Sequence, residues 1–315
     1  MLLWAIQELN MKILFTSIVR LRILSSFKIL FLALFCLGLV GCRQKPRNQE
    51  KLPVKFDPKL TEEERIDSIY QLGVIAGTTG KFQLAEQQFE SVLQMRPNHL
   101  EATHDLGLVY ARTGKIRQAI EYFQRTLEIN PNFAEAYYNL AIAYHNTGQI
   151  EMGEGYLDRT LQLSPNHRKA LISKAKLSMR RGEMRLATQL YAHYVKNYPT
   201  DMETRALLGN LYFQQGLDEN ARLELLKVIK HKPTAKVLYH LGVIYHRKAD
   251  LNTAQKFYDK ALEKDPNFVD CLVSMGELLE RLGVTGKALL FFERAFGLDP
   301  GNEYIRKKLI KLRRG

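Results

Sequence analysis

The sequence has too little cysteine for a network of disulfides. Only Cys36, Cys42 and Cys271 occur among 315 residues. Their separations fit neither a set of disulfide pairs nor the ligand spacing of a zinc site. We therefore expect Cys271 to be an unpaired thiol in or near the core.

The sequence also lacks a recognisable catalytic or cofactor-binding pattern. The eight histidines form no His-Glu-x-x-His pair, and no serine lies in a nucleophile-elbow context. The segment from Gly77 to Lys81 ends like a P-loop, but Ile75 stands where an earlier glycine is required and Phe82 where Ser or Thr is required. We expect no enzyme activity, no cofactor and no metal site.

Excess positive charge is scarce in the body of the chain. Of the net charge of +13, residues 1–41 carry +3, residues 43–57 carry +3 and residues 303–315 carry +5, which leaves +2 for residues 58–302. A nucleic-acid-binding domain gathers its basic residues on one folded surface. This distribution therefore argues against nucleic acid as a partner.

The amino-terminal 41 residues have the pattern of a secretory signal. Basic residues precede an apolar run of 13 residues, from Ile29 to Gly41, which is shorter than the roughly 20 residues that cross a bilayer. The run ends in Leu39-Val-Gly-Cys42, which resembles a bacterial lipobox. That resemblance implies cleavage before Cys42 and a lipid anchor on it. Met11 is an alternative start, because it would begin a more ordinary leader.

Residues 42–60 contain three prolines and no apolar periodicity, which predicts a flexible tether after the lipidated cysteine. The residue after Cys42 is Arg43 and not aspartate. In similar lipoproteins this favours the outer over the inner membrane, so we expect a cell-envelope location, lipid-anchored. The alternative is that residues 29–41 form an anchor that is never cleaved.

Proline recurs with a nearly constant period over the remaining chain. Seven of the ten prolines follow one another at 34, 34, 34, 34, 33 and 34 residues, and such a period indicates a repeat architecture. The period divides residues 61–302 into seven units: 66–99, 100–133, 134–167, 168–201, 202–234, 235–268 and 269–302.

The second unit shows why each repeat should be a pair of helices. Thr103, Leu106, Gly107 and Tyr110 follow the i, i+3, i+4, i+7 spacing of one helical stripe. A glycine then ends this helix, and a second apolar stripe runs until Pro131 stops it.

The third unit carries a family resemblance in Tyr137, Leu140, Ala141, Tyr144, Gly148 and Pro165. These residues resemble the tetratricopeptide-repeat consensus, and the other units repeat most of its types. The resemblance implies an all-α fold, namely a right-handed α-solenoid of seven helix-turn-helix units. A capping box at Thr61 opens it. Residues 303–315 should form a basic capping helix, with Tyr304, Ile305, Leu309 and Leu312 on its buried face.

Several units depart from the consensus. Ala249 replaces the turn glycine of the sixth unit, and Gly153 replaces an alanine in the third. In the fourth unit Lys174 and Ser178 stand where leucine and tyrosine are expected. A lysine in a core stripe is costly unless its ammonium reaches solvent. We therefore expect residues 150–180 to be the loosest joint of the array.

The resemblance also implies a groove lined by the first helix of each unit, in which a peptide or helix of a partner protein binds. The groove positions carried onto this sequence are Tyr70, His104, Tyr138, Asn139, His145, Asn146, Lys176, Arg180, Asn210, Phe213, Tyr239, His240 and Arg247. Of the residues that some relatives use to clamp a terminal carboxylate, only Asn139 is present. A receptor for chaperone tails is therefore not expected.

We interpret the chain as a membrane-anchored scaffold or adaptor for proteins in a bacterial envelope complex, with self-association open. The alternative is a binder of an anionic glycan or acidic partner through the basic fourth unit. The basic residues of that unit are Arg168, Lys169, Lys174, Lys176, Arg180, Arg181, Arg185 and Lys196.

Overall fold

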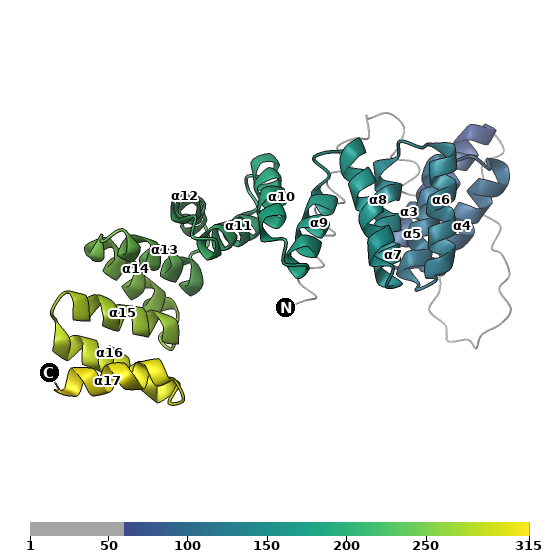
Figure 1. The fold of residues 1–315 in the computed structure, drawn as a ribbon. Helices are drawn as coiled ribbons and strands as arrows, with labels where there is room; N and C mark the ends of the chain where they lie inside the picture. The colour runs from purple at the N-terminus through teal and green to yellow at the C-terminus, as the bar shows by residue number, and fades with distance from the viewer. Residues whose placement is uncertain (1–59, 315) are drawn as a thin grey trace, which may run out of the picture. The chain divides into compact units, whose positions relative to one another are not determined.

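The computed structural model describes residues 60–314, and all regular structure in that range is α-helical. The fifteen helices of this range confirm the predicted all-α solenoid of helix pairs, in which each helix packs against the next (Figure 1). The first helices of the pairs are α3 (Glu62–Thr78), α5 (Leu100–Arg112), α7 (Ala134–Asn146), α9 (Arg168–Arg180), α11 (Met202–Gln214), α13 (Ala235–Arg247) and α15 (Val269–Arg281). The second helices are α4 (Phe82–Met95), α6 (Ile116–Ile129), α8 (Ile150–Leu163), α10 (Met184–Asn197), α12 (Asp218–Ile229), α14 (Leu251–Lys264) and α16 (Thr285–Leu298).

The last helix, α17 (Glu303–Arg314), covers the end of the array. Its Ile305 and Leu309 are buried as predicted. Tyr304 was expected on the same face, but it is exposed and donates a hydrogen bond from its hydroxyl to Glu277. The predicted signal, Cys42 and the tether up to residue 59 lie outside the described residues.

The helices begin and end where local chemistry directs. Thr61 forms the predicted capping box, since its side chain accepts from the Glu64 amide and the Glu64 carboxylate accepts from the Thr61 amide. Six of the seven turns within the pairs contain a glycine with φ between 71° and 80°. In the sixth pair the turn residue is Ala249, with φ of 59°. The turn conformation therefore persists even where its preferred residue is absent.

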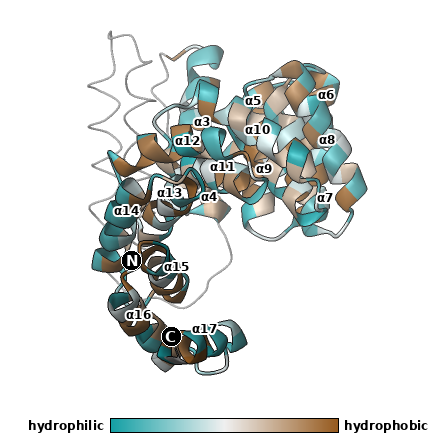
Figure 2. Cartoon of the chain, turned by 60° about the vertical axis from the view of Figure 1, so that its left-hand side comes forward, coloured by the Kyte–Doolittle hydropathy of each residue, from teal (hydrophilic) through white to brown (hydrophobic). Residues whose placement is uncertain are grey.

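In five of the seven pairs the two helices approach closely at a glycine of the first helix, and in the third and fourth pairs Ala141 and Ala175 take that position. A Cβ on Gly107 would lie 2.7 Å from the ring of Phe123 on the partner helix, well inside van der Waals contact. Phe123 is buried, and burying such a side chain contributes about 1.5–3 kcal/mol. Along the helices hydrophobic residues alternate with hydrophilic ones (Figure 2), as this packing requires.

Polar contacts to the period-setting prolines join successive pairs. Arg125 donates to the Pro97 carbonyl at 2.8 Å, and Arg294 donates to the Pro266 carbonyl at 2.6 Å. The same position of the fourth pair is His193, whose Nε2 lies 3.2 Å from the Pro165 oxygen. Each contact ties a second helix to the end of the preceding unit.

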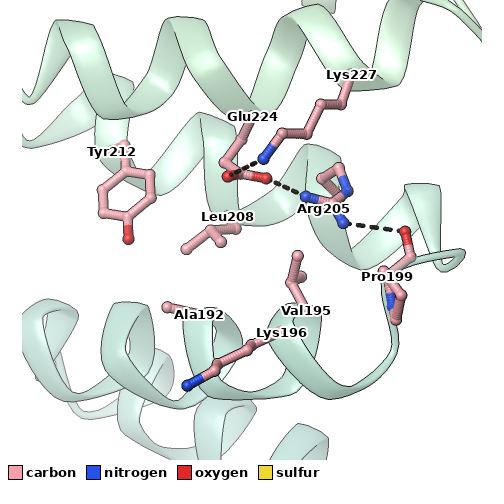
Figure 3. Close-up of a pocket in the computed structure, with 9 residues that line it drawn as sticks. All are labelled: Ala192, Val195, Lys196, Pro199, Arg205, Leu208, Tyr212, Glu224 and Lys227. Carbon is pink, nitrogen blue, oxygen red and sulfur yellow. Dashed lines mark hydrogen bonds and ion pairs between the residues drawn. The ribbon is translucent and has the colours of Figure 1, made fainter.

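The joint between the fourth and fifth pairs uses a different arginine. Arg205 on α11 lies between α10 and α12, donates to the Pro199 carbonyl at 2.9 Å, and pairs with Glu224 (Figure 3). Glu224 also accepts from Lys227 at 2.9 Å, at the edge of a hollow of about 330 Å³. Arg205 is buried at a position where three other units place leucine, namely Leu171, Leu238 and Leu272. Removing only Glu224 would leave the buried charge of Arg205 without this partner, which is costly. The ion pair therefore restricts substitution at both positions and is not simply a source of stability.

The joint between the third and fourth pairs is the most loosely packed. Contact between α8 and α9 is the sparsest of any successive helix pair in the described range. Its buried core consists of Ala141, Leu157 and Ala170, two of which are small. Lys174, in the core stripe of α9, reaches Asp158 on α8. The lysine thus pairs across the joint, at the expense of apolar contact there.

The left-handed turn at Ala249 predicts a stabilising substitution. Ala249→Gly should raise the free energy of unfolding by about 0.5–1 kcal/mol, because glycine adopts positive φ without the steric cost that a Cβ brings. Urea unfolding measures this difference. Gly148→Ala is the matched control at an equivalent turn with φ of 80°, and it should destabilise. Loss of stability in both variants would contradict this explanation.

Candidate partner-binding face on the first helices

The predicted groove positions lie along the first helices, and we call the thirteen residues given above the first-helix face. The first helices contact one another directly between α3 and α5, α5 and α7, α11 and α13, and α13 and α15. Side chains of successive units therefore meet across the face. These contacts form a polar chain, a set of ring pairs and one stacked cluster.

The polar chain joins the first three units. The Tyr70 hydroxyl donates to Asp105 Oδ2 at 2.9 Å, and His104 Nδ1 lies 3.0 Å from Asp105 Oδ1. The Asn139 amide nitrogen lies 2.8 Å from His104 Nε2. Since a carboxylate only accepts, His104 carries its proton on Nδ1 and accepts the bond from Asn139 at Nε2. Burial, assisted by Asp105, raises the pKa of Tyr70, so its hydroxyl stays protonated and keeps donating.

Ring pairs join four of the first helices, α3, α5, α7 and α13, to the N-cap residue of the next first helix. The centroid distances are 5.2 Å for Tyr70 with His99, 5.1 Å for His104 with Phe133, 5.1 Å for Tyr138 with His167 and 4.9 Å for Tyr239 with Phe268. His99 and His167 also cap their helices, since their Nδ1 atoms accept from the backbone amides of Ala102 and Ala170. These two histidine rings are therefore held both by the capping hydrogen bond and by the neighbouring tyrosine ring.

Sequence reasoning missed the four cap residues of these pairs: His99, Phe133, His167 and Phe268. Three of them follow one another at the 34-residue period. An aromatic residue recurring at the start of successive helices was the signal that would have found them.

A stacked cluster joins α11 and α13. His240 Nδ1 donates to Asn210 Oδ1 at 2.7 Å, and the His240 ring stacks on Phe213 with centroids 4.2 Å apart and an interplanar angle of 13°. The Arg247 guanidinium lies 4.8 Å from the centre of the Phe213 ring and forms an ion pair with Asp218 at 2.8 Å. Phe213 is thus covered on two sides.

Three predicted groove residues are turned away from solvent. His104 and His240 are only 8% and 6% exposed, because neighbouring rings cover them. The His145 ring packs on α8 at Gly153, where a Cβ would lie 2.3 Å from it, and its buried Nε2 has no hydrogen-bond partner in the described range. These histidines position other groups, and their assignment as partner contacts stays a prediction.

The departure at Gly153 now has a physical reason, because only glycine leaves room for His145.

The remaining predicted groove residues differ in exposure. The exposed ones are Asn146, Lys176, Arg180 and Arg247, and the half-buried ones include Tyr138, Asn139, Asn210, Phe213 and Tyr239. The accessible part of the first-helix face is therefore made of aromatic edges, amides and cations. Such side chains suit a peptide backbone, since they offer area with few rotors and adaptable hydrogen bonds.

In the described range no group of three His, Cys, Asp or Glu side chains could hold a metal ion. Cys271 is fully buried and unpaired, as predicted, and burial raises the pKa of its thiol to about 12. Among residues 60–314 no helix is both long and apolar enough to cross a membrane.

Comparisons with known proteins agree with this architecture. Models of the tetratricopeptide repeat match residues 70–115, 134–167 and 235–268, and a further TPR repeat model matches residues 107–148. The described part of the chain is an α-solenoid of helix pairs. Residues 70–167 and 235–268 of this solenoid carry tetratricopeptide repeats.

Two curated proteins resemble part of the chain. Tetratricopeptide repeat protein 21B of Xenopus laevis is 31% identical over 127 residues, which are 36% of this chain and 10% of that protein. The uncharacterized protein ycf37 of Cyanophora paradoxa is 25% identical over 107 residues, which are 32% of this chain and 62% of that protein. The chain thus matches less than two thirds of either relative.

Solved structures share the fold. A chain of the Naa15/Naa10 complex bound to HypK-THB has a TM-score of 0.58 at 15% identity, covering 79% of this chain and 39% of that chain. The C-terminal part of a TPR repeat-containing protein from Cytophaga hutchinsonii has a TM-score of 0.55 at 15% identity, covering 76% of this chain and 99% of that chain. At these identities the likeness extends to the fold alone.

The stacked cluster predicts a pH dependence of stability. Burial lowers the pKa of His240 to about 4 from an unfolded value near 6.5, and Lys236 and Arg247 add to the effect. Because the folded state disfavours the proton, this contribution is complete above pH 6.5 and is lost as the pH falls toward 4. Between pH 7 and pH 5 the wild type should lose about 2 kcal/mol more than His240→Phe in urea unfolding. An NMR titration midpoint of His240 near 6.5 would contradict this.

Proposed function

We propose that the chain is a protein-binding scaffold that holds an extended segment of a partner along its first-helix face. Tetratricopeptide-repeat folds serve protein–protein interaction. The observation that supports this role most directly is the set of contacts between first helices, which fixes the face before any partner arrives. Three of the ring pairs involve tyrosines, and one chain of hydrogen bonds spans three units.

Preorganisation of the face favours binding because less side-chain freedom is lost on association. Ordering a rotamer-rich side chain costs about 0.5–1.5 kcal/mol on binding. Tyr138 and Tyr239 are already held against His167 and Phe268, yet each remains partly exposed. They are the aromatic anchors that we assign to the partner.

We further propose that the scaffold acts at the cell envelope through a lipid on Cys42, with the outer membrane as the favoured location. Support comes from the sequence alone: a basic and then apolar leader, the Leu39-Val-Gly-Cys42 ending and Arg43 after it. Anchoring needs more than one acyl chain for stable attachment, and a multiply acylated cysteine meets that need. Metabolic acyl labelling that persists after Cys42→Ala would rule out this anchor.

A groove double variant tests the scaffold role. Tyr138→Ala with Tyr239→Ala should abolish capture of the partner from detergent-solubilised envelopes, because both aromatic anchors lose their contact area. Affinity capture with the full chain, read by quantitative mass spectrometry against the wild type, measures the loss. We expect at least one protein to be depleted tenfold or more, which corresponds to about 1.4 kcal/mol.

The matched control removes two tyrosines from second helices, Tyr122→Ala on α6 and Tyr156→Ala on α8, whose rings pack against Tyr110 and Tyr144. Circular dichroism should show all variants to be helical. A partner lost equally from both double variants, or from neither, would count against the first-helix face as the binding surface.

A further inference from the structure

One helix of the first-helix face carries a row of cations that form no ion pair in the described range. Lys169, Lys176 and Arg180 follow one another at seven and four residues on α9, so they share one side of the helix. All three are exposed, and none has an ion-pair partner within residues 60–314. The row therefore holds unused positive charge on a binding surface.

The other basic residues around α9 are occupied. Arg168 pairs with Asp201 at 3.5 Å, Lys174 pairs with Asp158, and Arg181 pairs with Glu154. These pairs lie at the joints to neighbouring helices, where they serve the fold. The three cations of the row are thus distinguished from the structural ones by their lack of partners and by their position.

The row has the dimensions of a short peptide. With a rise of 1.5 Å per residue, the eleven steps from Lys169 to Arg180 span about 16 Å along α9. An extended chain covers that length in about five residues. Two or three carboxylates within five residues of a partner would therefore reach all three cations.

Amides on the first helices of the neighbouring units offer opposite hydrogen-bonding groups. Asn139 on α7 uses its NH₂ group toward His104, which leaves its oxygen available as an acceptor. Asn210 on α11 uses its oxygen toward His240, which leaves its NH₂ group available as a donor. A peptide backbone carries both N–H and C=O groups, so it can use both amides. The buried histidines fix which group each amide offers.

Charge on the flanking helices limits the choice of ligand. Glu135 and Glu203 occupy the positions equivalent to Lys169 in the units before and after, and both are exposed. At the Lys169 end of the row, positive charge is therefore confined to α9. An anionic glycan repeats its charge along the whole chain and would meet these carboxylates, whereas a peptide can place its acidic residues over α9 alone.

We propose that Lys169, Lys176 and Arg180 bind a short acidic segment of a partner protein, whose backbone is held by Asn139 and Asn210. This inference rests on the proposed scaffold function and names the chemistry of the segment that the first-helix face takes. Lys169, whose ammonium lies 5.7 Å from the centre of the Tyr138 ring, links the cation row to that aromatic anchor.

The experiment uses a fluorescein-labelled eight-residue peptide in which four glutamates alternate with alanine, and the same peptide with glutamine for glutamate. Fluorescence anisotropy with the full chain in mild neutral detergent gives Kd at low and moderate salt. The glutamate peptide should bind at least tenfold more tightly than the glutamine peptide at 50 mM salt, a margin of the size that a few exposed ion pairs provide. The margin should shrink at about 0.3 M salt because the charges are screened.

Charge-removing variants test whether binding depends on the row itself or only on the basic character of the fourth unit. Lys176→Gln with Arg180→Gln should weaken binding of the glutamate peptide about tenfold. Arg185→Gln with Lys196→Gln removes the same charge from the same unit but at its other helix, α10, and should change Kd less than twofold. Equal losses in the two double variants would overturn the proposal, as would equal affinity for the two peptides.

Other anions are included as competitors. A sulfated polysaccharide or anionic phospholipid vesicles that bind through the row, while the glutamate peptide does not, would overturn the peptide proposal in favour of that ligand. The wider scaffold role is judged separately by the Tyr138 and Tyr239 double variant. If its partner is lost but the row variant keeps that partner, only the acidic-segment inference fails. If neither variant loses a partner, the scaffold role fails too.

Discussion

The close approach of the two helices within each pair is the constraint on which the rest of the structure depends. It requires a small residue on the first helix opposite a large apolar side chain on the second, as Gly107 opposite Phe123 and Gly209 opposite Leu225 show. When this contact recurs at a 34-residue period, the first helices come to lie beside one another. The first-helix face is a consequence of that repetition, since each unit places equivalent positions next to each other.

Contacts between first helices are unevenly distributed along the array. The polar chain joins α3, α5 and α7, and the stacked cluster with the Tyr239 pair joins α11, α13 and the cap of α15. At α9 the link is made by the Tyr138 and His167 rings at its cap. In a repeat protein each unit contacts only its neighbours, so a weak joint divides the array into cooperative segments. A partner seated on α9 would therefore bridge the two better-linked segments.

Much of the fold follows from the sequence because it depends on local rules. The proline period, the turn glycines and the Thr61 capping box each specify backbone conformation within a few residues. Even Ala249, an exception by residue type, adopts the left-handed turn that its position demands. The functional face was harder to predict. A helical stripe says which side of a helix a residue occupies, but whether His104 or His240 is covered depends on a ring contributed by another unit.

The features that the sequence did not predict also depend on contacts between different helices and units. Arg205 and Glu224 come from different helices, and the pairing of Lys174 with Asp158 spans two units. Nothing near Arg205 in the sequence indicates that the carbonyl of Pro199 and a carboxylate 19 residues away would both face it. Such partners are set by packing between units. Residue type alone is compatible with several different pairings.

The central claim, that the first-helix face holds the partner, is tested most directly by site-specific photo-crosslinking in intact cells. A photoreactive amino acid would replace Asn146 or Gln214, which are exposed at the ends of α7 and α11, and in parallel Gln162 or Asn220, which are exposed on α8 and α12. The account predicts crosslinks to one and the same protein from the first two positions and none to it from the other two. Crosslinks confined to the second helices would contradict the account.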